Sequence, residues 1–343
     1  MSEKRTEIGQ LGEFGLIDKL ALLAPSLSEK TLLGIGDDAA ILKVSGDILL
    51  STDMLVEGIH FDLSYMPLMH LGYKAVSVNV SDIAAMNGTP HHITVNIGLS
   101  NRFSVEAVET LYKGIFSACK DFKIDLVGGD TTASQTGLLI SVSIIGSVQP
   151  DKVVKRSGAG KGDIICVSGD LGAAYLGLQV LEREKQVFQS NPNMQPDIEK
   201  YQYMVQRQLK PVARMDVIHE LAEQDIVPTS MIDVSDGLGS ELLHISKASG
   251  VGVKIYEENL PLDRMVYETA VEFKIDSTAC MLNGGEDYEL LFTIQQSDYE
   301  KLKNHPDIHF IGYVQDQTAG NVLITKSQHE VPITAQGWNH FNS

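Results

Sequence analysis

At least five aspartates, spread over about 200 residues, stand beside a glycine, serine or threonine at an expected strand end or helix start, and any fold of this chain must accommodate them. Carboxylate and hydroxyl oxygens are the hard ligands that Mg²⁺ prefers, and an ion shared with substrate phosphates needs few protein ligands. So many acids converging without metal would repel one another. The pattern therefore predicts a site for several Mg²⁺ ions. The motifs are Gly36-Asp37-Asp38, Ser51-Thr52-Asp53, Ser81-Asp82, Gly129-Asp130-Thr131 and Asp233-Val234-Ser235-Asp236.

The composition is that of an ordinary globular chain with 343 residues, 43% apolar content and a mean hydropathy of −0.02. A chain of this length predicts two domains. The net charge of −18 argues against binding to a nucleic-acid backbone, because phosphates repel a strongly acidic protein. Cys119, Cys166 and Cys280 fit no zinc or redox spacing, which predicts buried, inert thiols.

The chain carries no sign of a membrane segment or an export signal. No apolar run approaches the ~20 residues that a membrane helix needs. The polar start at residues 1–7 does not resemble a signal peptide. We therefore expect a cytoplasmic protein without a membrane partner.

Hydrophobic periodicity predicts a mixed sheet with helices in the first half and alternating strands and helices in the second. A turn-rich segment at 156–163 precedes a new strand, which places the domain boundary near residues 150–155. The expected fold is an α+β amino-terminal mixed-sheet domain, residues 1–150, followed by an α/β domain, residues 151–343. Residues 186–202 are expected to form an exposed excursion. In the first half we expect helices at 13–23, 72–86 and 105–122, and strands at 32–34, 48–54, 93–99, 124–127 and 138–148.

Two segments look like nucleotide-binding motifs but fail on their chemistry. Residues 34–39 match the dinucleotide fingerprint, yet two carboxylates occupy the loop where a helix must face a pyrophosphate. Residues 158–162 look like a phosphate loop, but Lys161 is followed by glycine instead of the Ser or Thr that would hold Mg²⁺. If the protein binds ATP, metals and other loops must hold the phosphates.

Each acidic motif of the first half allows two interpretations. Strand alternation puts Ser51 and Asp53 on one face, with Thr52 at the strand end, although a turn after a buried strand would give the same pattern. Asp82 lies on an apolar helical stripe, and because burying a lone carboxylate is costly it needs a metal or a cap; we favour the metal. Asp130 follows a strand and a glycine pair, which suits a phosphate–metal contact or a tight turn.

The acids of the second half are equally open to two interpretations. Ser235 or Asp236 could cap the helix that follows, whereas Asp233 lies inside the strand pattern. Residues 283–290 concentrate three acids beside a glycine pair and a strand. That segment is either a place to grip a cationic substrate or a group of solvated edge acids.

Taken together, these motifs resemble the thiamine-monophosphate kinases, in the superfamily that also holds aminoimidazole ribonucleotide synthetase, selenophosphate synthetase and the hydrogenase-maturation dehydratase. The Ser-Thr-Asp strand, the His60 loop and the Gly-Gly-Glu-Asp-Tyr-Glu motif, in this order, are typical of the kinase branch. The selenophosphate branch needs a reactive amino-terminal cysteine, whereas the first cysteine here is Cys119. The resemblance spans nearly the whole chain, through residues 12–14, 34–40, 51–61, 73–86, 128–132, 156–158, 233–238 and 284–290.

The resemblance implies ATP-dependent phosphorylation of thiamine monophosphate to thiamine pyrophosphate by a homodimer whose amino-terminal sheets pair into a barrel. The positions implied to hold the thiamine phosphate are His60, Glu286 and Trp338. The positions implied to contact ATP are Gly129, Asp130, Arg156 and Ser235, with Tyr112 facing the nucleotide in some members. The implied magnesium ligands are Asp38, Ser51, Thr52, Asp53, Asp82, Asp130, Asp233 and Asp236.

The chemistry agrees with that implication. Transfer between two polyanions chiefly requires charge neutralisation and in-line alignment, which several Mg²⁺ ions supply. A phosphate acceptor is already ionised near neutral pH, so we assign neither a general base nor a protein nucleophile and expect direct transfer. Two alternatives remain: a non-catalytic sensor that binds Mg²⁺ and nucleotide, or a kinase for another phosphorylated acceptor.

Overall fold

A computed structural model describes residues 6–24, 28–35 and 39–334. The chain divides into two compact units by the density of its contacts. Unit 1 comprises residues 1–83 and 88–151, and unit 2 comprises residues 84–87 and 152–343. Among the described residues, no helix is long and apolar enough to cross a membrane.

Unit 1 is built on a four-stranded mixed sheet in the order β3-β6-β4-β5. The β3·β6 and β6·β4 pairs are antiparallel, and β4·β5 is parallel. A separate two-stranded sheet joins β1 and β2. The elements are α1 (Ile8–Ala21), β1 (Thr31–Leu33), β2 (Ile41–Leu42), β3 (Asp47–Val56), α2 (Leu68–Ala85), β4 (Thr89–Leu99), α3 (Val105–Phe122), β5 (Asp125–Ala133), β6 (Leu139–Val148) and η1 (Pro150–Lys152).

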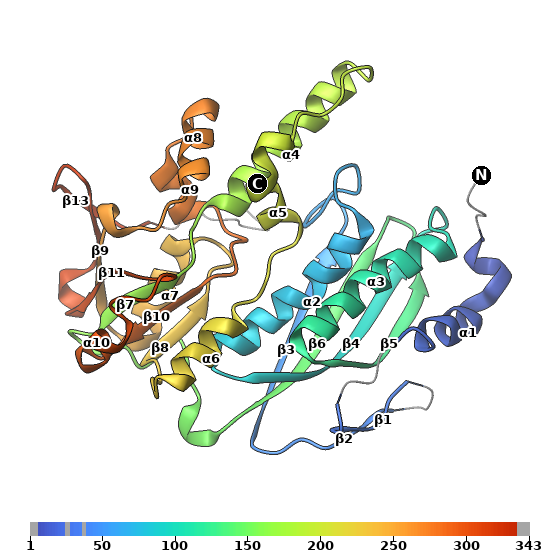
Figure 1. Ribbon diagram of the computed structural model, residues 1–343, viewed down its shortest axis with the longest axis horizontal. Helices are drawn as coiled ribbons and strands as arrows, with labels where there is room; N and C mark the ends of the chain where they lie inside the picture. Colours follow the sequence, from blue (N-terminus) through green and yellow to red (C-terminus); the bar gives the residue numbers. More distant parts are fainter. Residues whose placement is uncertain (1–5, 25–27, 36–38, 335–343) are drawn as a thin grey trace. The chain divides into compact units, whose positions relative to one another are not determined.

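Helices α2 and α3 lie on one face of this sheet (Figure 1). Helix α3 presents Val108, Leu111 and Ile115 as a buried stripe at helical spacing. Strand β6 alternates between buried and half-buried residues along its whole length, as expected when only one face is covered by helices. This arrangement places the β3 side chains that point toward the helices next to α2.

Unit 2 contains a seven-stranded sheet in the order β13-β12-β9-β11-β7-β10-β8. Its neighbouring strands are antiparallel except for the parallel β12·β9 pair. Its strands are β7 (Ile164–Ser168), β8 (Ser230–Asp233), β9 (Gly252–Tyr256), β10 (Leu290–Ile294), β11 (Ile308–Gln315), β12 (Asn321–Ile324) and β13 (Glu330–Pro332). Its helices are α4 (Ala173–Ser190), η2 (Glu199–Tyr201), α5 (Gln202–Leu209), α6 (Met215–Glu223), α7 (Leu238–Ser249), η3 (Glu257–Asn259), α8 (Arg264–Phe273), α9 (Ser277–Asn283), η4 (Gln296–Asp298), α10 (Tyr299–Leu302) and η5 (Gln317–Ala319).

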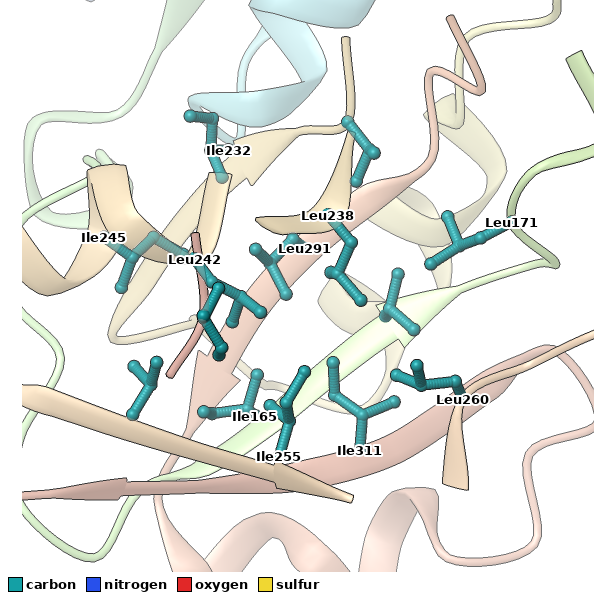
Figure 2. Packing of buried hydrophobic residues seen from close by; sticks show 14 of the residues in the cluster. Ile165, Leu171, Ile232, Leu238, Leu242, Ile245, Ile255, Leu260, Leu291 and Ile311 are labelled. Carbon is teal, nitrogen blue, oxygen red and sulfur yellow. The ribbon is translucent and has the colours of Figure 1, made fainter. Parts of the chain in front are cut away.

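Figure 2 shows the core that fixes α7 on this sheet. Leu238, Leu242 and Ile245 form one buried stripe of the helix, at spacings of four and three residues. They belong to the same cluster as strand residues such as Ile165 on β7 and Leu291 on β10. Burial of this stripe holds the start of α7, and with it the 234–237 loop that leads into the helix, at the end of β8.

The mixed α/β architecture expected from the sequence is confirmed, and the expected helices of unit 1 lie within a few residues of α2 and α3. The excursion at 186–202 is exposed over most of its length, but α4 continues as a helix to Ser190 before the chain leaves it. Cys119, Cys166 and Cys280 are free and buried, as predicted. Burial raises the pKa of the Cys119 thiol to about 12 and that of Cys280 to about 11, so both thiols are protonated at neutral pH.

Candidate active site

Ser51, Asp53 and Asp82 come together in unit 1. Alternation along β3 turns Ser51 and Asp53 toward the helices, and the Ser51 hydroxyl donates a hydrogen bond of 2.5 Å to a carboxylate oxygen of Asp82 on α2. Burial and, to a smaller extent, the nearby charge of Asp82 together raise the pKa of Asp53 to about 6. The structure thus holds two carboxylates close enough to oppose each other's ionisation.

The donor set at this pair fits a magnesium ion. Both carboxylates and the Ser51 hydroxyl supply hard oxygen atoms. One helical turn before Asp82, the Asn79 amide nitrogen donates to the Ala75 carbonyl at 3.0 Å. Within the described part of the chain, the Oδ1 atom of the Asn79 side-chain amide is buried without a hydrogen-bond partner. A cation here would relieve the repulsion between the acids and could offer this oxygen a partner, directly or through its water shell.

The other predicted ligands of unit 1 are not gathered around this pair. Thr52 points to the opposite face of β3, where its hydroxyl bonds the Val142 carbonyl at 3.0 Å and lies 3.1 Å from the Ser143 hydroxyl. Asp130 is exposed within β5, which continues to Ala133 instead of ending in a tight turn, and its carboxylate accepts the backbone N–H of Thr131 at 2.9 Å. Across the described ranges, no three His, Cys, Asp or Glu side chains are arranged to hold one metal. Asp38 lies outside the described residues.

Gly129 has a structural reason to be glycine. In the parallel β4·β5 pair it faces Val95, and a Cβ atom there would lie 1.9 Å from the Val95 carbonyl oxygen. The residue therefore allows β5 to approach β4, and its contact with ATP stays a prediction.

His60 and Tyr112 are held in place by unit 1 itself. The His60 Nδ1 atom accepts the Val56 backbone N–H at 3.0 Å, in the turn that follows β3, so the ring is oriented by the chain four residues earlier. Tyr112 is buried on α3 and packs against Phe116, with ring centroids 5.8 Å apart. Burial raises the pKa of Tyr112 to about 12. The substrate and nucleotide contacts of these two residues stay predictions, and Trp338 lies outside the described residues.

In unit 2 the end of β8 carries Asp233, and the loop from β8 to α7 carries Ser235 and Asp236. Asp233 is the buried last residue of β8, whereas Asp236 is exposed. The capping position of α7 is Gly237, and no side chain caps the helix there. The interpretation of Ser235 or Asp236 as an N-cap is therefore wrong, and both side chains are left for another role.

Glu241 is a site residue that sequence reasoning missed. Its carboxylate is buried in the first turn of α7 and accepts the Asp236 backbone N–H at 2.9 Å. The pKa of Glu241 is raised to about 7, chiefly by burial. The hydrogen bond from Asp236 and the charge of Arg156 lower it, whereas the charges of Asp236 and Asp233 raise it, and the value is the net result. Glu241 lies three residues after Leu238 on the buried stripe of α7, so the periodicity that marked Asp82 could have marked it too.

Two of the three acids in residues 286–289 bind other parts of unit 2. The Asp287 carboxylate accepts the backbone N–H groups of Gly172 at 2.7 Å and Ala174 at 3.2 Å, at the start of α4. Glu289 is buried, accepts the Ser168 hydroxyl at 2.6 Å and pairs with Arg207 and Arg214. The interpretation of these acids as solvated edge residues is wrong for both.

Glu286 is placed differently from those two acids. It is half-buried, and one of its carboxylate oxygens accepts the Gln208 side-chain amide at 2.7 Å. Its backbone has a φ of +59°, a left-handed conformation that non-glycine residues seldom adopt. Tyr288 of the same motif shares this conformation, with a φ of +52°. Since strained backbone of this kind clusters at functional positions, Glu286 is the acid of the motif best suited to meet a ligand.

Comparison with known proteins shows which family this chain is similar to. Residues 36–148 match the model of AIR synthase related protein, N-terminal domain. The thiamine-monophosphate kinase of Aquifex aeolicus (strain VF5) is 36% identical over 333 residues, 97% of this chain and 99% of that protein. The enzyme of Bacillus subtilis (strain 168) is 32% identical over 318 residues, 90% of this chain and 93% of that protein.

A solved structure, AaThiL complexed with AMPPCP and TMP, aligns with a TM-score of 0.75 and 33% identity over 99% of this chain and 100% of that one. The relatives therefore match along both units rather than over a single motif. The resemblance inferred from the order of the acidic motifs is confirmed. On this full-length similarity, the chain belongs to the thiamine-monophosphate kinase family.

Proposed function

We propose that this chain transfers the γ-phosphoryl group of ATP to thiamine monophosphate, which yields thiamine pyrophosphate and ADP. One observation carries the proposal: a structure that aligns over 99% of the chain holds AMPPCP, an ATP analogue, together with TMP. The curated relatives share the kinase name over 90% and 97% of the chain. The enzyme class is a phosphotransferase with a phosphate group as acceptor.

The acids of both units are suited to hold magnesium during this reaction. Bound Mg²⁺ would neutralise charge on the phosphate oxygens of the two substrates. In unit 1, Asp53 and Asp82 offer two carboxylates whose repulsion a cation would relieve. In unit 2, Asp236 offers an exposed carboxylate while Glu241 fixes its backbone. The proposed ligands are Asp38, Ser51, Thr52, Asp53, Asp82, Asp130, Asp233 and Asp236.

The remaining site residues orient the two substrates. Glu286 supplies a carboxylate, which suits the cationic thiazolium ring, and Trp338 supplies an aromatic face for the same ring. His60 is proposed to hold the substrate phosphate. Because the acceptor oxygen is already ionised, the protein needs only to align it with the γ-phosphorus and exclude water. The proposed ATP contacts are Gly129, Asp130, Arg156, Ser235 and Tyr112.

The edge strand β3 supports a homodimer as the working form, and we propose that this form works in the cytoplasm. Ile48, Leu50 and Met54 lie on one face of β3 and are 61%, 72% and 51% exposed. Apolar side chains aligned on one face of an edge strand are suited to pairing with a second copy of the sheet. Leu50→Glu should give a monomer by light scattering after size exclusion, whereas Glu29→Gln, at an exposed position away from β3, should leave the mass unchanged. A Leu50→Glu protein with the wild-type mass would refute this surface.

The activity is tested with purified protein, Mg-ATP and thiamine monophosphate, with ADP and thiamine pyrophosphate followed together by chromatography. Equimolar ADP and thiamine pyrophosphate are expected, and no pyrophosphate from thiamine alone. Magnesium-dependent ATP binding without product would favour the sensor. ADP formation with another phosphorylated acceptor would favour a different kinase.

A further inference from the structure

We propose that Gln208 is a positioning residue for the substrate: its side-chain amide orients the Glu286 carboxylate and thereby sets the affinity for thiamine monophosphate. The inference rests on the proposed function, because it concerns the substrate side of the same site. It adds a residue from α5 that the acidic motifs do not contain. Its basis is the hydrogen bond of 2.7 Å from the Gln208 amide nitrogen to Glu286.

The backbone of Glu286 is fixed before Gln208 acts on its side chain. The Glu286 N–H donates to the Ser235 carbonyl at 2.7 Å, and the Tyr288 N–H donates to the Val234 carbonyl at 2.9 Å. At Gly285, with a φ of +70°, a Cβ atom would lie 2.6 Å from the Ser235 carbonyl oxygen. The 284–289 segment is therefore locked against the loop that carries Asp236.

These backbone bonds leave the Glu286 side chain with several rotatable bonds of its own. A long carboxylate side chain that is not held loses rotamer entropy when it binds a ligand. The Gln208 amide removes part of that loss by holding one carboxylate oxygen in advance. A charged acceptor makes this hydrogen bond stronger than one between neutral groups.

Gln208 is itself rigidly placed. Its side chain is only 4% exposed on α5. The preceding residue, Arg207, binds the same segment at two points, with a Glu289 carboxylate oxygen at 2.8 Å and the Asp287 carbonyl at 3.4 Å. Two consecutive residues of α5 thus bind the first and the last residue of the 286–289 segment. The position of the Gln208 amide relative to this segment is therefore fixed.

The test compares Gln208→Leu with Gln206→Leu, since Gln206 is an exposed residue of the same helix. Gln208→Leu should raise the KM for thiamine monophosphate about tenfold, the size expected for one hydrogen bond to a charged group. The KM for ATP and kcat should stay within about twofold, because the backbone that carries Asp236 is untouched. Gln206→Leu should change none of these values.

A double-mutant cycle separates positioning from general packing. Glu286→Asn removes the carboxylate while keeping a residue that tolerates positive φ. If Gln208 acts through Glu286, the double variant binds thiamine monophosphate no more weakly than Glu286→Asn alone. Independent, additive losses would overturn the proposal. If Gln208→Leu does not fold, Gln208→Asn, which keeps an amide but shortens the side chain, takes its place with the same expectations.

The outcomes distinguish this inference from the proposed function. Wild-type protein that makes no thiamine pyrophosphate refutes both. Wild-type activity with a Gln208→Leu KM for thiamine monophosphate within twofold of normal refutes only the role of Gln208. A parallel rise in both KM values together with a lower melting temperature would show that Gln208 serves the fold alone.

Discussion

Asp53 in unit 1, which is half-buried, and Asp287 in unit 2, which is buried, both have raised pKa values, about 6 and about 7, but their surroundings differ. Burial is the largest cause in both. The neighbouring charge at Asp53 is another acid, Asp82, whereas Asp287 accepts two backbone N–H groups and lies beside Arg207. When both acids of the first arrangement are ionised, a cation is needed to make it favourable, whereas the second arrangement is complete within the chain.

This contrast shows that a shifted pKa alone does not identify a site residue. The partner of the acid decides its task. Acids with protein donors, such as Asp287 and Glu289, connect α4, α5 and β10 and hold the fold. Acids that face other acids, such as Asp53, are available to a ligand. Variants that remove one acid from each class should therefore have opposite effects.

The largest expected effect is a loss of catalysis when one acid of the Asp53 and Asp82 pair in unit 1 is replaced. Asp82→Asn should lower turnover about a thousandfold, because a metal-holding charge is lost where phosphoryl charge develops. Without Mg²⁺ its free energy of unfolding should equal or exceed that of wild type, since one of two like charges is gone. Steady-state kinetics and urea denaturation measure the two quantities. Asp47→Asn, at an exposed position on β3, the strand that carries Asp53, is the control and should change neither. An unfolded Asp82→Asn protein, judged by circular dichroism, would indicate a structural role instead.

The opposite outcome is expected from Glu289→Gln in unit 2. Loss of this buried charge leaves Arg207 and Arg214 without their shared partner and should lower the free energy of unfolding by about 3 kcal/mol. The exposed pair of Lys254 and Glu330 provides the control, since Glu330→Gln should cost less than about 0.5 kcal/mol. Both are read from urea midpoints. A loss below about 1 kcal/mol for Glu289→Gln would mean that the buried network is not what holds these elements.

The sequence could predict acids that face other acids, such as Asp53, better than acids bound by protein donors, such as Asp287. Alternation along β3 places Ser51 and Asp53 on one face, and helical spacing places Asp82 on a buried stripe, so local periodicity is enough to find them. The same rule would have found Glu241. These signals work because the side-chain direction follows directly from the element in which the residue lies.

Residues 286–289 show why the rest could not be predicted. Three acids in four positions look alike in sequence, and their partners come from far along the chain: Gly172 is 115 residues from Asp287, and Arg214 is 75 residues from Glu289. Which acid is left for a ligand depends on contacts that only the folded unit 2 provides. The metal ligands and the dimer stay predictions for a further reason, because each depends on ions or chains beyond a single folded unit.

The smallest expected effect is a pH dependence that Asp53 imposes on stability. The folded pKa of about 6 is above the ordinary aspartate pKa of 3.8, so the native state binds more protons than the unfolded state between these values. The Asp53 contribution is fully present below pH 4 and is lost as the pH rises through 6. In EDTA, wild type should therefore lose stability relative to Asp53→Asn between pH 4 and pH 6, on the order of 1 kcal/mol after solvent screening is allowed for. Urea denaturation at pH 4, 5, 6 and 7 measures this difference in stability.

Saturating Mg²⁺ should remove or reverse the difference at pH 7, because the ion stabilises the ionised pair. If the free energy of unfolding of the two proteins in EDTA depends on pH in the same way, Asp53 ionises in the folded protein as easily as in the unfolded one. Asp53 would then not be an acid whose ionisation its surroundings oppose, and its contrast with Asp287 would fail.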